Sequence, residues 1–186
     1  MINLQMEFLE LVKQRQSVRR FSDKAVEKEK LEKCLKAAFL APSASNAQPW
    51  KYIVVDNPSL KNEIAEATYS TIVKLNKFVL QAPIVVVIVI EKANIKSRIG
   101  QVVKNIEYPL IDIGISAEHF CLQATELGLG TCMLGWFNEI KIKKTLDIPK
   151  NKKIGLLIAL GYAPKDYKLR DKIRKDEKEV CIFNKY

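Results

Sequence analysis

Seven consecutive apolar residues, Ile84 to Ile90, constrain the fold more than any other stretch of this chain. The run has the length of one strand, and its apolar side chains point to both faces, so other elements must cover each face. Apolar residues recur at helical spacing over 5–15, 28–40 and 108–127, and Pro58 marks the start of a helix that ends near Glu66. The sequence therefore predicts a central strand enclosed by helices.

The remaining pattern completes one domain, residues 1–186, because neither a repeat nor a linker divides the chain. Further strands are predicted over 50–56, 131–137, 153–162 and 180–183, and further helices over 71–81 and 139–146. Residues 94–107 are polar and poorly periodic, and they receive no assignment. Because the strands are few and one lies at the far C-terminus, an α+β fold with a mixed β-sheet packed between helices is expected.

Composition narrows the class of protein. A 186-residue chain that is 48% hydrophobic can bury one substantial core without disulfides. No run approaches the ~20 apolar residues of a membrane span, and residues 1–10 lack the pattern of a signal peptide. We therefore expect a cytoplasmic protein without a membrane partner. The four cysteines form no C-x-x-C pair and His119 is the single histidine, so we expect no metal and buried, reduced thiols.

The positive charge is concentrated near the C-terminus. The net charge is +10, and residues 141–186 contain 14 basic and six acidic residues. Such a region suggests nucleic acid, a membrane surface or an anionic ligand. The basic residues lack the interleaved aromatic residues of a nucleic-acid platform. A phosphate-bearing cofactor is the best specific interpretation, although lysine-rich surfaces also occur without any partner.

Two basic segments lie near opposite ends of the chain. Arg15-Gln16-Ser17-Val18-Arg19-Arg20-Phe21 places a hydroxyl between two arginines, a combination that can surround a phosphate. Lys172-Ile173-Arg174-Lys175 repeats the cationic character near the C-terminus. Taken alone, either segment is equally expected on a solvated surface.

Two further segments have the composition of ligand-contacting loops. Ala41-Pro42-Ser43-Ala44-Ser45-Asn46-Ala47-Gln48-Pro49-Trp50 can present hydroxyls and amides to a flat polar ligand. Glu126 to Gly135 contains three glycines that permit close backbone approach to a ligand. A helix-to-strand connection and a plain helix stop explain these segments equally well. The G-x-G-x-x-G spacing of a dinucleotide site is missing.

In order and content, these four segments resemble those of the FMN-dependent nitroreductase family. The family has an R-x-S-x-R/K-x-F segment, an A-P-S-x-x-N-x-Q-P-W loop, a G-L-G-x-x-x-x-G turn and a K-x-R pair. The loop is the most specific match, since all seven of its defined positions agree over residues 41–50. The resemblance extends from residue 7 onward. It implies a nitroreductase-like α+β fold and a domain-swapped homodimer with FMN at the subunit interface.

The resemblance also implies a set of cofactor-binding residues in three groups. Those at the phosphate and ribityl chain are Arg15, Ser17, Lys172 and Arg174. Those at the flavin ring in the same subunit are Arg19, Asn76, Leu134 and Gly135. Those that reach the flavin from the other subunit are Pro42, Ser43 and Asn46. The spacing from Asn76 to Ala82-Pro83 is one residue off the family pattern, and Met133 stands where many short members have Trp.

The activity implied is electron transfer from NADH or NADPH, through tightly bound FMN, to nitroaromatic, quinone or similar small acceptors by a ping-pong mechanism. Flavin N5 carries the hydride, so no catalytic side chain is expected, and His119 is expected to be structural. Two alternatives stay open. The same fold could serve reductive dehalogenation or flavin breakdown, or the chain could be a non-catalytic basic protein that binds nucleic acid.

Overall fold

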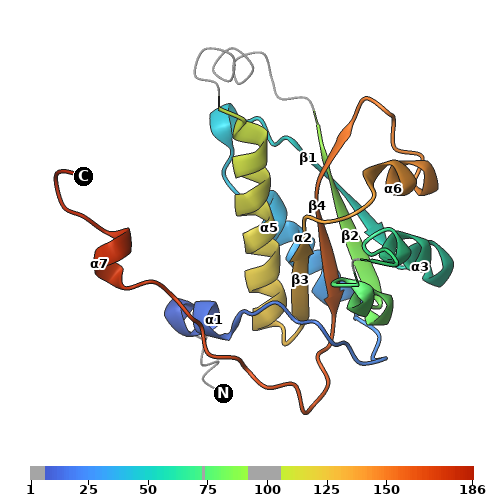
Figure 1. The fold of residues 1–186 in the computed structure, drawn as a ribbon, viewed down its shortest axis with the longest axis horizontal. Coiled ribbons are helices and arrows are strands. Elements are labelled where there is room, and N and C mark those ends of the chain that lie inside the picture. The colour runs from blue at the N-terminus through green and yellow to red at the C-terminus, as the bar shows by residue number, and fades with distance from the viewer. Residues whose placement is uncertain (1–6, 73, 92–105) are drawn as a thin grey trace.

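The computed structural model describes residues 7–72, 74–91 and 106–186 of the chain (Figure 1). Almost all of the segment left unassigned from the sequence, 94–107, lies outside these residues. The described part consists of a sheet with helices on both faces, from which the C-terminal residues extend away (Figure 1).

The sheet contains four strands in the order β1-β2-β4-β3, and every neighbouring pair is antiparallel. The strands are β1 (Trp50–Val55), β2 (Ile84–Ile90), β3 (Gly130–Leu134) and β4 (Lys153–Gly161). The α+β prediction is confirmed. A mixed sheet was expected, with parallel as well as antiparallel strands. In the described part of the chain, the only parallel pairing is one isolated bridge between Ser17 and Thr131.

The central apolar run occupies an inner position, as its pattern requires. Ile84, Val86 and Ile88 pack against α2 (Lys28–Phe39) and α5 (Tyr108–Glu126) on one face. The alternate residues from Val85 to Val89 pack on the opposite face, which α3 (Pro58–Glu66) and α6 (Glu139–Thr145) cover (Figure 1). Because successive side chains of a strand point to opposite faces, one apolar run supplies both cores.

Local sequence signals set several helix ends. Asn57 accepts hydrogen bonds from the backbone N–H groups of Ser59 and Leu60, both at 3.1 Å, and Pro58 occupies the first turn of α3. At the end of α5, Gly128 adopts φ 75°, and Leu129 N donates to Ala124 O at 2.8 Å. The predicted start of α3 and the glycine stop of α5 are therefore confirmed.

Two predicted elements are wrong. Within the described residues of 71–81, the only helix is the 3-10 turn η2 (Lys77–Gln81), because the Asn76 side chain just before it donates to Thr68 O and to Trp136 O instead of lying on a helix surface. The strand expected over 180–183 is replaced by α7 (Glu177–Val180), whose start Asp176 caps by accepting from Lys178 N at 2.9 Å. No strand edge of the described sheet lies beside this segment.

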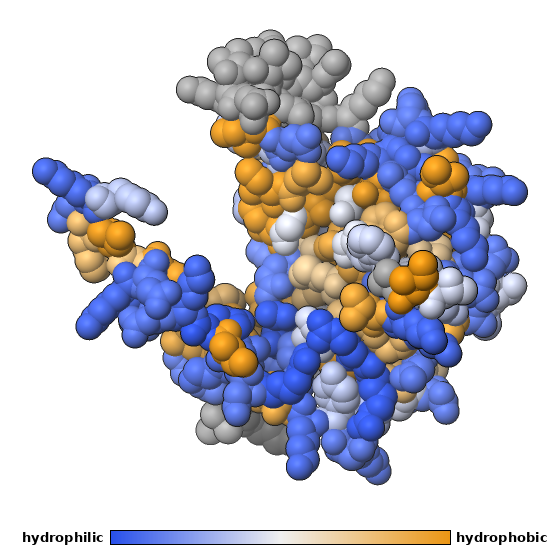
Figure 2. Space-filling view, viewed as in Figure 1, coloured by the Kyte–Doolittle hydropathy of each residue, from blue (hydrophilic) through white to orange (hydrophobic). Residues whose placement is uncertain are grey.

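The chain ends in an exposed arm, residues 163–186, that passes α1 (Phe8–Gln14) and leaves the sheet (Figure 1). Most of its apolar side chains face solvent, with Ile173 92% and Phe183 84% exposed. Figure 2 shows orange side chains along this arm and over the N-terminal half of α5. Further exposed apolar residues on α1 and α5 are Phe8, Leu9, Leu110 and Ile111.

The cysteines mostly behave as expected. Cys34, Cys121 and Cys132 are buried, and Cys181 is exposed in the arm. Burial raises the pKa of Cys34 and of Cys121 to about 12, so these thiols stay protonated and act as small apolar residues. Within the described ranges, no helix combines the length and the apolar character needed to cross a bilayer.

Candidate anion-binding site

The segment that follows α1 lies along the edge strand β3. Val18 N donates to Thr131 O at 2.8 Å, and Ser17 forms the parallel bridge with the same residue. Val18 is buried against Gly130, where an added Cβ would lie 2.7 Å from Val18 Cγ2. The glycine at this position therefore allows the backbone of residues 15–19 to approach the sheet closely.

Gly130→Ala is expected to destabilise the protein by about 1–3 kcal/mol, because the new methyl group would overlap the buried Val18 side chain. Thermal unfolding would measure the change. Gly135→Ala serves as the control, since nothing lies within 4 Å of a Cβ added there. Equal unfolding midpoints for the two variants would contradict the close packing of Val18 on β3.

The first half of the arm packs on the same segment. Tyr167 OH accepts from Arg19 N at 3.0 Å, and Arg170 Nη2 donates to Ser17 O at 2.7 Å. Lys172 Nζ donates to Arg15 O. Side chains and backbone from the two ends of the chain therefore meet, as the proposed convergence on one phosphate requires.

A hollow of about 430 Å³ opens between the two segments. Its lining residues are Arg15, Gln16, Ser17, Arg19, Arg170, Asp171, Lys172, Ile173 and Arg174. Five of these side chains are cationic and only one is acidic, so the hollow has a strong excess of positive charge. Of the predicted site residues, five lie here: Arg15, Ser17, Arg19, Lys172 and Arg174.

Two observations indicate that the cations lack sufficient counter-charge. Arg15 Nε lies 3.2 Å from Glu118 Oε1 without hydrogen-bond geometry, and this buried nitrogen has no hydrogen-bond partner within the described residues. Burial lowers the pKa of Lys172 below the usual lysine value, and the charges of Arg15 and Arg174 lower it further. A bound anion would add counter-charge beside Arg15 and favour the charged form of Lys172.

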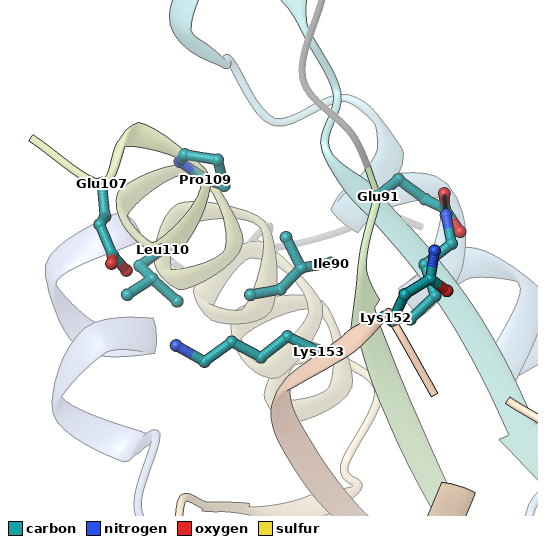
Figure 3. Close-up of a pocket in the computed structure, with 8 residues that line it drawn as sticks. Ile90, Glu91, Glu107, Pro109, Leu110, Lys152 and Lys153 are labelled. Atoms are coloured by element: carbon teal, nitrogen blue, oxygen red, sulfur yellow. Dashed lines mark hydrogen bonds and ion pairs between the residues drawn. The ribbon is translucent and has the colours of Figure 1, made fainter. Parts of the chain in front are cut away.

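Arginine groups and a hydroxyl around one hollow suit a phosphate, which guanidinium groups bind through paired hydrogen bonds. A second hollow, of about 280 Å³ at the ends of β2 and β4, differs in character (Figure 3). There Glu91 pairs with Lys152, and Glu107 and Lys153 also line the walls, so its charges balance. The first hollow is therefore the candidate anion site.

Residues predicted at the flavin ring lie near the same edge of the sheet. Burial raises the pKa of the Cys132 thiol, whereas the charge of Arg19 and the Ser17 hydroxyl act in the opposite sense, so both face β3 near this thiol. Leu134 ends β3 and Gly135 follows it. Arg19 therefore lies close to β3, although its side chain is exposed.

Asn76 lies beside the turn that follows β3, as the assignment requires. Its Nδ2 donates to Thr68 O and to Trp136 O, both at 3.2 Å, and Trp136 directly follows Gly135. Both amide hydrogens are thus used by the backbone. A ligand would be bound through the remaining carbonyl oxygen, as an acceptor.

The loop residues Pro42, Ser43 and Asn46 do not line the cationic hollow of their own chain. The loop contacts α5 at Asp112, whereas Arg15 contacts α5 at Glu118. Six helical residues separate these contacts by about 9 Å along the axis and about 120° around it. The structure therefore places the two sets on different sides of α5.

Sequence reasoning did not assign a role to Gln16, Tyr167 or Arg170, which join the two segments around the hollow. Gln16 Oε1 accepts from Arg170 N at 3.2 Å, and Gln16 Nε2 donates to Lys168 O at 3.3 Å. For Arg170, the sequence does contain a pattern that could have predicted its place. It alternates with Lys172 and Arg174, and alternate residues of an extended segment share one face. Gln16 and Tyr167 act through contacts about 150 residues apart, for which the sequence has no marker.

The fold is α+β, and a hollow lined by five cationic side chains lies where segments from the two ends of the chain meet. The Nitroreductase family model matches residues 12–76 and 72–162, and the chain belongs to this family of oxidoreductases. A nitroreductase family protein from Clostridium novyi NT has a solved structure that is 38% identical, with a TM-score of 0.76 and 89% of each chain covered.

Two other relatives bear on the chemistry. The FMN-dependent nitroreductase from Clostridium difficile R20291 has a solved structure that is 30% identical, with a TM-score of 0.77, 95% of this chain and 99% of that chain covered. Iodotyrosine deiodinase 1 of Sus scrofa is 26% identical over 208 residues, covering 98% of this chain and 70% of the relative.

Proposed function

We propose that this chain is a cytoplasmic, FMN-dependent oxidoreductase that transfers electrons from NADH or NADPH to nitroaromatic, quinone or similar small acceptors by a ping-pong mechanism. The observation that carries the proposal is the hollow with five cations and an unsatisfied Arg15 Nε. FMN is the cofactor of a 30% identical family member, and its phosphate has the charge that this hollow lacks.

In this proposal, the chain's residues bind and orient the cofactor. Arg15, Lys172 and Arg174 hold the phosphate by charge, and Ser17 holds it or the ribityl chain through its hydroxyl. The backbone of Leu134 and Gly135 and the carbonyl oxygen of Asn76 contact the ring. Arg19 places positive charge near the pyrimidine end of the ring, where Coulomb attraction favours added negative charge. Bound FMN would supply the redox chemistry, and no protein acid or base is needed.

The proposed dimer follows from predicted flavin-contacting residues that do not line the hollow of their own chain. Pro42, Ser43 and Asn46 lie on a different side of α5 from the hollow, so they would reach the flavin of a second copy. The exposed apolar side chains of α1, α5 and the arm would be buried in such a dimer. These two observations support a homodimer with FMN at the interface.

The test is the colour and turnover of the purified protein. A yellow protein that NADH or NADPH bleaches, and that an acceptor re-oxidises, supports the proposal. The initial rate would be measured with a panel of nitro compounds and quinones. Parallel lines in double-reciprocal plots at different fixed acceptor concentrations would support the ping-pong order. A colourless protein that binds no added FMN and shifts labelled RNA would instead support the nucleic-acid-binding alternative.

A second activity on the same site is reductive dehalogenation, which the likeness to iodotyrosine deiodinase 1 favours over flavin breakdown. Halogenated aromatic compounds therefore belong in the same panel. Halide release that exceeds the rate of nitro and quinone reduction would select this alternative.

A further inference from the structure

The loop between α2 and β1 has backbone φ angles that its residue types do not favour. Ser45, Asn46 and Gln48 adopt φ values of 52°, 50° and 46°, in the left-handed region that residues other than glycine rarely occupy. Three such residues within four positions persist only when surrounding contacts determine the conformation. The contacts that hold this loop are therefore part of how Ser43 and Asn46 are presented.

Side-chain-to-backbone hydrogen bonds hold the loop, and two of them involve Ser43 and the start of the 3-10 turn. Ser43 Oγ accepts from Gln48 N at 2.9 Å within the loop. Asp112 Oδ1, from α5, accepts from Ala44 N at 3.0 Å, at the start of the 3-10 turn η1 (Ala44–Asn46). Asp112 is 3% exposed, and its Oδ2 is buried without a hydrogen-bond partner in the described part of the chain. A buried carboxylate thus joins the loop to the helix that also contacts Arg15 through Glu118.

We propose that Asp112 is a positioning residue for the FMN site. It fixes Ala44, and thereby sets the conformation in which Pro42, Ser43 and Asn46 contact the flavin of the second copy. The role rests on the proposed function. Asp112 itself touches neither flavin nor substrate, and it acts through the loop backbone.

Ser116 provides a matched control, since it is a buried polar residue one turn further along α5. Its Oγ donates to Ala38 O at 2.7 Å and shares a 2.7 Å hydrogen bond with Tyr52 OH. These bonds join α5 to α2 and β1 rather than to the loop. Ser116→Ala therefore removes a comparable buried hydrogen bond and leaves the loop contact intact.

The first measurement is amide hydrogen exchange of the full chain without flavin. Asp112→Ala is expected to speed exchange in residues 43–48 at least tenfold, whereas Ser116→Ala changes it less than twofold. Asp112→Asn keeps an acceptor for Ala44 N, so its exchange is expected within threefold of wild type. Unchanged exchange at 43–48 in Asp112→Ala would overturn the role of Asp112.

The second measurement is FMN binding. Asp112→Ala is expected to raise the FMN dissociation constant at least tenfold and to alter the visible circular dichroism of bound flavin, with Asp112→Asn and Ser116→Ala close to wild type. Failure of the proposed function is recognised separately, because the wild-type chain itself would then bind no FMN. Equal dissociation constants and spectra for wild type and Asp112→Ala overturn the positioning role alone.

Discussion

Arg15→Ala is expected to raise the dissociation constant of FMN about 10- to 150-fold, because a hydrogen bond to a charged group contributes roughly 1.5–3 kcal/mol. The reason lies in the environment of this guanidinium. Its Nε is buried and lacks a hydrogen bond, and its only described counter-charge is Glu118. Fluorescence titration of the flavin-free protein with FMN would measure the change.

The control for charge is Arg20→Ala, at the residue that follows Arg19 of the hollow. Arg20 pairs with Asp166 at 2.7 Å and does not line the hollow, so its loss removes the same charge without a phosphate ligand. We expect its FMN affinity within threefold of wild type. Arg15→Lys keeps the positive charge but loses the paired N–H donors of the guanidinium. Its FMN affinity should therefore lie between those of Arg15→Ala and Arg20→Ala. Equal losses of FMN affinity in Arg15→Ala and Arg20→Ala would mean that the hollow acts only through its overall positive charge, without a specific phosphate contact from Arg15.

Much of the fold could be predicted because its elements carry their own signals. The run Ile84–Ile90 is apolar on both faces and became β2 with the predicted bounds, and α3 likewise begins at Pro58 and ends at Glu66. Where the sequence prediction failed, distant contacts override the local pattern. Asn76 is bound by carbonyl groups at Thr68 and Trp136, and the apolar residues near 180 have no strand edge to join.

The site likewise contains residues that could be predicted from the sequence and contacts that could not. Its cationic residues could be predicted from motif order, since Arg15 and Lys172 lie in segments that resemble those of the family. Their supporting contacts were not, because Tyr167 reaches Arg19 and Asp112 reaches Ala44 across 148 and 68 residues, respectively. Such pairs follow from tertiary packing, and a single sequence contains no measure of it. The structure therefore adds the residues that hold the site in place.

Replacing Val180, Ile182 and Phe183 together by serine is expected to weaken the proposed dimer at least 1000-fold. These residues are exposed, Phe183 by 84%, and the end of the arm to which they belong lies away from the sheet (Figure 1). Burying an apolar side chain of this size contributes about 1.5–3 kcal/mol, so three of them contribute more than the ~4 kcal/mol that a 1000-fold change represents. Sedimentation equilibrium across a dilution series would measure the association.

The control on the same segment is Lys178→Ala with Lys185→Ala, two exposed lysines whose loss should leave the dimer constant within threefold. The flavin gives a second readout. If Ser43 and Asn46 reach the flavin of the second copy, the triple serine variant must lose FMN as it dissociates, although its own cationic hollow is intact. A triple variant that sediments as a monomer and retains a full complement of FMN would mean that one chain binds the cofactor alone. The loop at 41–50 would then need another ligand.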